Sequence, residues 1–77
     1  MEYQAEWTDT YGGEANYSWV RRATIEAPTD ISDRAIVRRA KRELGISGVK
    51  GRTYYHGDMI EFRPYRMCCV MFIHAQY

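Results

Sequence analysis

The side chains that could carry out acid–base chemistry lie in one short stretch, as His56, Asp58 and Glu61. A histidine beside a carboxylate can transfer a proton near neutral pH. No nucleophile motif, phosphate-binding loop or paired-carboxylate signature accompanies these residues. Turn chemistry explains Asp58, and the end of a strand explains His56. We therefore expect a protein that is not an enzyme and that uses no cofactor.

Metal ligands are the second chemistry to consider, because Cys68, Cys69 and His74 follow in the chain. On a regular strand, Cys68 and His74 would share a face but lie about 20 Å apart, too far to hold one ion. Cys69 and His74 would point to opposite faces. We expect no metal site, and we interpret the two cysteines as reduced thiols in the core of a cytoplasmic protein.

Binding chemistry is a stronger signal, because the basic side chains are unevenly distributed. All eleven lysine and arginine residues follow residue 19, whereas four of the ten acidic residues precede it. The segment between Ile31 and Gly45 carries five of these bases: Arg34, Arg38, Arg39, Lys41 and Arg42. Because the formal net charge is only +1, an acidic protein surface is at least as good a target as the phosphates of a nucleic acid.

These bases belong to a predicted amphipathic helix. Ser32 is a good N-cap, Ile31 and Ile36 are placed as a hydrophobic staple, and Gly45 can close the helix. At about 100° per residue, one stripe holds the apolar side chains Ile36, Val37, Ala40 and Leu44. The opposite arc holds the bases Arg34, Arg38, Lys41 and Arg42. We expect the helix to lie on a sheet with this basic arc facing outward.

Strands are predicted on both sides of the helix. Residues 2–8 alternate polar and apolar side chains, residues 16–27 continue the alternation, and a glycine-containing turn between them favours a hairpin. Residues 52–56 and 59–63 flank Gly57-Asp58 as a second hairpin, with a type II′ turn as one option. The continuous apolar run of residues 67–75 predicts a central strand.

The elements together predict a single α+β domain over residues 1–77, in the order β-β-α-β-β-β. One helix would cover one face of a four- or five-stranded antiparallel sheet. The other face would stay open and, with seven tyrosines and two tryptophans available, could be an aromatic interaction surface or a homodimer interface. Trp7 and Trp19 are expected in the core. The tyrosines expected outside it are Tyr11, Tyr54, Tyr65 and Tyr77.

The N-terminal residues show no signal-peptide pattern, and the longest apolar run is far shorter than the about 20 residues that span a bilayer. We therefore expect no membrane association.

A resemblance is carried by three segments, residues 17–22 (YSWVRR), 33–41 (DRAIVRRAK) and 56–61 (HGDMIE). They resemble short proteins encoded in the accessory regions of phages and prophages. That group includes anti-defence inhibitors such as anti-CRISPR proteins. The resemblance implies that a host complex is blocked stoichiometrically, without catalysis. It brings no defining motif, so no functional residue is carried over from it.

We therefore predict a small non-enzymatic protein that binds a host protein or ribonucleoprotein complex. The side chains expected at the interface are Arg34, Arg38, Lys41, Arg42, Arg52, Tyr54 and Tyr11. The alternative is a nucleic-acid-binding module that places the same arginines on phosphates and tyrosines on bases. Whether the basic arc or the open sheet face forms the interface, and whether the chain dimerises, stay open at this point.

Overall fold

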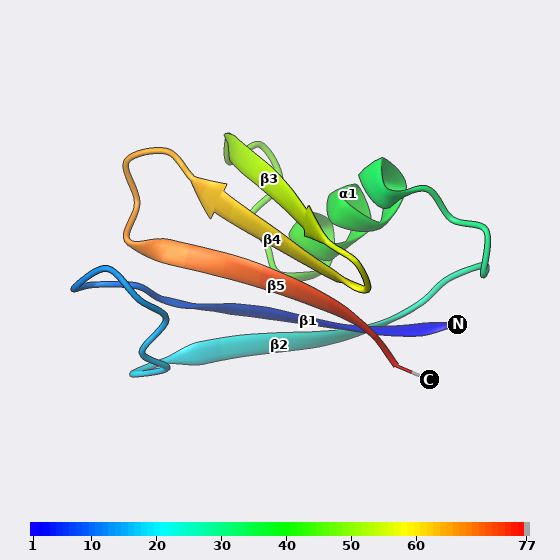
Figure 1. Ribbon diagram of the computed structural model, residues 1–77, viewed down its shortest axis with the longest axis horizontal. Helices are drawn as coiled ribbons and strands as arrows, with labels where there is room; N and C mark the ends of the chain where they lie inside the picture. Colours follow the sequence, from blue (N-terminus) through cyan, green and yellow to red (C-terminus); the bar gives the residue numbers. More distant parts are fainter. Residues whose placement is uncertain (77) are drawn as a thin grey trace.

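One helix lies across one face of a five-stranded antiparallel sheet in the computed structural model, which describes residues 1–76 (Figure 1). The elements are β1 (Glu2–Asp9), β2 (Val20–Glu26), α1 (Asp33–Glu43), β3 (Gly51–His56), β4 (Met59–Pro64) and β5 (Cys69–Gln76). This order confirms the predicted α+β fold. Tyr77 lies outside the described residues, so its predicted position is not addressed.

The strands are arranged in the order β2-β1-β5-β4-β3, and every neighbouring pair is antiparallel. The apolar strand β5 is central, as predicted, and β2 and β3 form the two edges. The strand predicted over residues 16–27 is shorter in the structure, because residues 10–19 form a loop. In that loop, Asp9 Oδ2 accepts hydrogen bonds from the backbone N–H of Tyr11 (3.1 Å) and from Asn16 Nδ2 (2.7 Å).

The core lies between α1 and the face of the sheet that we call the inner face. Pairing across the central strands places Ala5 opposite Ile73 and Phe62 opposite Met71, and all four side chains are buried. The helix contributes the predicted apolar stripe, whose members are all buried: Ile36, Val37, Ala40 and Leu44. The inner face and this stripe form one continuous hydrophobic cluster.

Two predictions about the core are wrong. Trp19 is 41% exposed and lies in the loop before β2, where its ring centroid is 6.4 Å from that of Trp7. Cys68 is exposed and Cys69 only partly buried. The last strand begins at Cys69, two residues later than predicted, and Cys68 belongs to the preceding turn.

Both ends of α1 are capped by specific contacts. Ser32 Oγ accepts a hydrogen bond from the backbone N–H of Ala35 (3.1 Å), which confirms the predicted N-cap. At the other end Gly45 has a φ of +74°, and the backbone N–H of Ile46 donates to the Lys41 carbonyl (2.8 Å) in a Schellman-type closure. Arg21 of β2 adds a third contact, because its Nη1 donates to the Leu44 carbonyl at 2.6 Å.

We expect Arg21→Ala to lower the free energy of unfolding by about 1.5 kcal/mol, since it removes a charge-assisted hydrogen bond to the helix C-terminus. The matched control is Arg22→Ala, next to it on β2. Arg22 forms only an exposed ion pair with Glu6 (3.0 Å), so its loss should cost less than about 1 kcal/mol. Urea unfolding at neutral pH measures both, and an equal loss for the two variants would contradict the capping role.

Candidate binding site

A groove of about 350 Å³ lies between α1, the loop that follows it, and β3. Its basic side chains are Arg34, Arg38 and Lys41, and the remaining lining residues are Val37, Ser47, Gly48, Thr53 and Tyr55. Among these residues there is no carboxylate. The groove is therefore a concave surface with positive charge on one wall and hydroxyl and aromatic groups on the other. We call it the α1–β3 groove.

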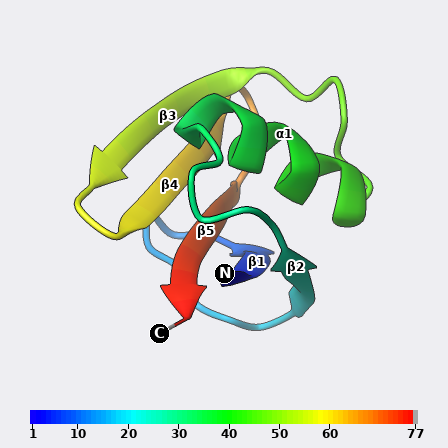
Figure 2. The same ribbon diagram turned by 90° about the vertical axis from the view of Figure 1, so that its right-hand side faces the viewer.

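The basic wall of the groove is formed by α1, because residues 34, 38 and 41 lie within one strip of the helix surface. The other wall is formed by β3, through the side chains of alternate residues. The register of β3 against β4 pairs Thr53 with Phe62 and Tyr55 with Ile60, so all four side chains lie on the inner face. Figure 2 shows α1 on the concave side of the curved sheet, beside β3. The groove is the part of the inner face, next to the edge strand β3, that α1 does not cover.

Lys41 differs from the other bases of the arc. Its Nζ donates a hydrogen bond to the Val49 carbonyl (2.9 Å) and lies 3.9 Å from the centroid of the Phe62 ring. Burial lowers the pKa of this amine from its ordinary value. The expectation that Lys41 faces outward is therefore wrong, since its side chain fastens the loop after α1 to the helix and lies over the sheet.

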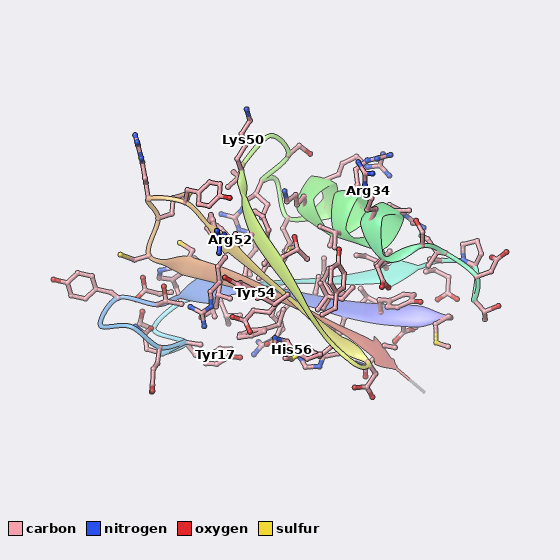
Figure 3. All side chains as sticks on the ribbon, turned by 45° about the horizontal axis from the view of Figure 1, so that its top comes forward. Tyr17, Arg34, Lys50, Arg52, Tyr54 and His56 are labelled. Atoms are coloured by element: carbon pink, nitrogen blue, oxygen red, sulfur yellow. The ribbon has the colours of Figure 1, made fainter. Side chains whose placement is uncertain are left out.

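Arg34 and Arg38 are the exposed cations of the groove. Within residues 1–76, neither has an ion-pair partner within 4.0 Å. Figure 3 shows Arg34 extending from α1 on the side away from the sheet. These two side chains agree with the predicted outward arc, and they are available to a ligand.

The other predicted site residues lie elsewhere. Arg42 is exposed on α1 but does not line the groove. Arg52 and Tyr54 point to the opposite face of the sheet, which we call the outer face, in a row along β3 with His56 (Figure 3). Tyr11 is exposed in the β1–β2 loop. The groove therefore brings together three of the predicted residues, Arg34, Arg38 and Lys41, and the remaining four lie outside it.

Sequence reasoning missed the β3 wall of the groove. Thr53 and Tyr55 alternate with Arg52 and Tyr54, and nothing in their residue types distinguishes the inner pair from the outer pair. The signal that could have found them is the Gly57-Asp58 turn. Gly57 has a φ of +67°, as the first central residue of a type II′ turn requires, and this turn sets the pairing of β3 with β4.

Arg52 lies beside tyrosines on the outer face. Tyr54 first, and then Tyr65, raise the pKa of the Arg52 guanidinium above its ordinary value, because their side-chain oxygens can accept hydrogen bonds from it. Arg52 and Tyr54 thus form a second, smaller group of a cation and exposed aromatic rings. It lies on the side of β3 opposite the groove.

The outer face is mostly polar, and its aromatic side chains include Tyr54 and Phe72. His56 Nε2 lies 3.1 Å from Glu61 Oε1, and Arg63 Nε donates to the other oxygen of Glu61. His56 and Glu61, considered above for acid–base chemistry, therefore meet in a surface ion-pair network, and Asp58 lies in the turn. At the other end of this face, Thr8 and Val70 are fully buried.

Burial alone would raise the pKa of the Glu61 carboxyl. The hydrogen bonds and charges of Arg63 and His56 outweigh that effect, and the pKa lies below its ordinary value. A carboxyl with a depressed pKa in the folded state stabilises the protein at neutral pH. That contribution is lost as the pH falls through the folded-state pKa.

Within residues 1–76, no group of three or more His, Cys, Asp and Glu side chains is placed to hold a metal ion. In the same range, the chain contains no helix with the length and apolar character needed to cross a membrane. Comparisons of the chain with protein-family models, with curated proteins and with solved structures find no match.

We expect Glu61→Gln to lower the stability at pH 7, and the difference from the parent chain to shrink and then vanish as the pH falls through the folded-state pKa of Glu61, which lies below its ordinary value. Urea unfolding across this pH range measures the difference. Glu26→Gln is the matched control, because the Glu26 side chain is 76% exposed and contacts only the N-terminal amine at 3.5 Å. A difference for Glu61→Gln that does not change with pH would show that its ion pairs contribute nothing.

Proposed function

We propose that this chain is a small non-enzymatic binding protein that acts stoichiometrically on an acidic surface of a host protein or ribonucleoprotein complex. The observation that carries the proposal is the α1–β3 groove, lined by three cationic side chains and no carboxylate. The most concrete version is a phage-encoded inhibitor of a host defence complex, which the resemblance of three sequence segments to anti-defence proteins implies.

The distribution of ion pairs supports this choice of surface. On the outer face, Arg22 is neutralised by Glu6 and Arg63 by Glu61, whereas Arg52 has no ion-pair partner among residues 1–76. In the groove, Arg34 and Arg38 have no such neighbour among residues 1–76. Positive charge that is not neutralised within the chain attracts an acidic partner and orients it on approach.

The residue types in the groove also suit a protein partner. Arginine and tyrosine are enriched among the residues that dominate binding energy in protein interfaces. Arg34 and Arg38 line the groove together with Tyr55, which is 52% exposed. A tyrosine with two torsions loses little conformational entropy on binding, and an arginine can bind a carboxylate through two parallel hydrogen bonds.

We expect the tagged chain to capture a complex from a lysate of its host, and Arg38→Glu to abolish that capture because it reverses a charge in the groove. Arg42→Glu is the matched control, with the same charge change on an exposed residue of the same helix, outside the groove. Quantitative mass spectrometry of the captured proteins measures both. Equal capture by the two variants would exclude the groove from the interface.

Nucleic-acid binding is the second candidate, supported by Arg52 and Tyr54 side by side on the outer face. A cation on phosphate beside an aromatic ring on a base is typical of single-strand recognition. We expect fluorescence anisotropy with single-stranded DNA and RNA to show affinity that falls steeply with salt and weakens in Tyr54→Ala. Tyr11→Ala is the control, because Tyr11 is also exposed but belongs to the β1–β2 loop and not to β3. Absence of binding at low salt rejects this candidate.

A further inference from the structure

We infer that the α1–β3 groove takes an acidic peptide segment in extended conformation, and that this segment adds to the sheet as a sixth strand, antiparallel to β3. The inference rests on the proposed function, since it specifies the chemistry of the partner. It is carried by two features that coincide in space, the unpaired edge of β3 and the charge of the groove.

The edge of β3 offers backbone hydrogen-bonding groups. In the part of the chain that the structure describes, residues 1–76, β3 pairs only with β4, at the end of the sheet order. His56 and Met59 close the two-residue turn, and hydrogen-bonded and non-hydrogen-bonded pairs alternate from there. Thr53 and Tyr55 fall at the non-hydrogen-bonded positions. Their N–H and C=O groups therefore point away from β4, and within residues 1–76 no backbone bond from a loop or turn reaches them.

The same two residues line the groove with their side chains. A strand added beside Thr53 and Tyr55 would therefore place its own inner-face side chains in the groove, next to Arg34 and Arg38. Side chains on one face of a strand recur about every 7 Å, and helix positions four residues apart lie about 6 Å apart. Two glutamates separated by one residue could then each reach one arginine.

The edge favours a peptide over a nucleic acid. A phosphodiester accepts hydrogen bonds but donates none, so it could pair with the N–H groups of Thr53 and Tyr55 and would leave their carbonyl groups without a donor. A peptide strand supplies both donors and acceptors, as in other cases of β-strand addition. The hydrogen-bonding groups of this edge therefore point to a polypeptide.

Charge disfavours a second copy of this chain as the added strand. Pairing two β3 edges about a two-fold axis would bring two sets of Arg34, Arg38 and Lys41 together, and none of the ten acidic side chains, all within residues 1–76, lines the groove to separate them. Like charges placed together in this way oppose association. An acidic segment of a different protein removes this repulsion, and so we assign the edge to such a segment.

The test uses the full chain and a synthetic peptide, acetyl-(Glu-Thr)4-amide. We expect one-to-one binding by calorimetry, with slowed amide exchange at Thr53 and Tyr55 by NMR. Arg38→Glu should raise the dissociation constant at least about tenfold, because Arg38 lines the groove. Arg42→Glu should change it by less than about twofold, because Arg42 does not line the groove. Equal binding by the two variants, or exchange protection on another strand, overturns the inference.

Two modified peptides test the backbone pairing separately from the charge. In an antiparallel pair, a residue whose side chain enters the groove also directs its own N–H to β3. N-methylation of every glutamate should therefore abolish binding, and N-methylation of every threonine should preserve it. Loss with both peptides, or with the threonine series alone, overturns antiparallel strand addition. Binding of the oligonucleotide (dT)8 in place of the peptide, with the same dependence on Arg38, overturns the choice of a polypeptide.

The outcomes for the inference and for the proposed function are distinguishable. Capture of a host complex that depends on Arg38, with no exchange protection at Thr53 and Tyr55 when the peptide is added, keeps the binding function and overturns strand addition. Peptide binding with the expected protection, when the chain captures nothing from a host lysate, supports strand addition and counts against the proposed host target.

Discussion

The packing of α1 against the inner face of the sheet is the contact on which the rest of this structure depends. Burial of each large apolar side chain such as Ile36 or Leu44 contributes about 1.5–3 kcal/mol, which is substantial for a chain of 77 residues. Ser32 and Arg21 hold the two ends of the helix in place. One helix of 11 residues is too short to cover the whole inner face of a five-stranded sheet. The inner face is therefore left partly open near β3, and this opening is the α1–β3 groove.

Much of this fold could be predicted from sequence because several elements carry strong local signals. Alternation in residues 2–8, the cap and apolar stripe of the helix, and the apolar run before the C-terminus all indicated the observed elements. The loop of residues 10–19 could not be predicted, because Asp9 and Asn16 form side-chain hydrogen bonds that replace regular strand pairing. The exposure of Trp19 follows from the position of this loop.

The candidate site was predicted only in part. One of its walls is a face of α1, which the local sequence determines, and the other depends on the register in which β3 pairs with β4. Angular position on the helix is a local property, and it placed Arg34 and Arg38 on the surface correctly. The contact of Lys41 with the Phe62 ring depends on where β4 lies, which the helix sequence does not determine. Since β3 is rich in residues suited to either face, a slip of one residue would exchange Thr53 and Tyr55 for Arg52 and Tyr54.

The exposed row of arginines on α1 has an intrinsic cost to the helix. Arg34, Arg38 and Arg42 follow one another at four-residue spacing, and like charges at that spacing destabilise a helix by about 0.2–0.5 kcal/mol per pair. Solubility does not require cations in one row, since mixed charges serve that purpose as well. An acidic partner in the groove would relieve the repulsion between Arg34 and Arg38. Binding and helix stability would then be thermodynamically coupled, and the partner would stabilise the helix on which the core depends.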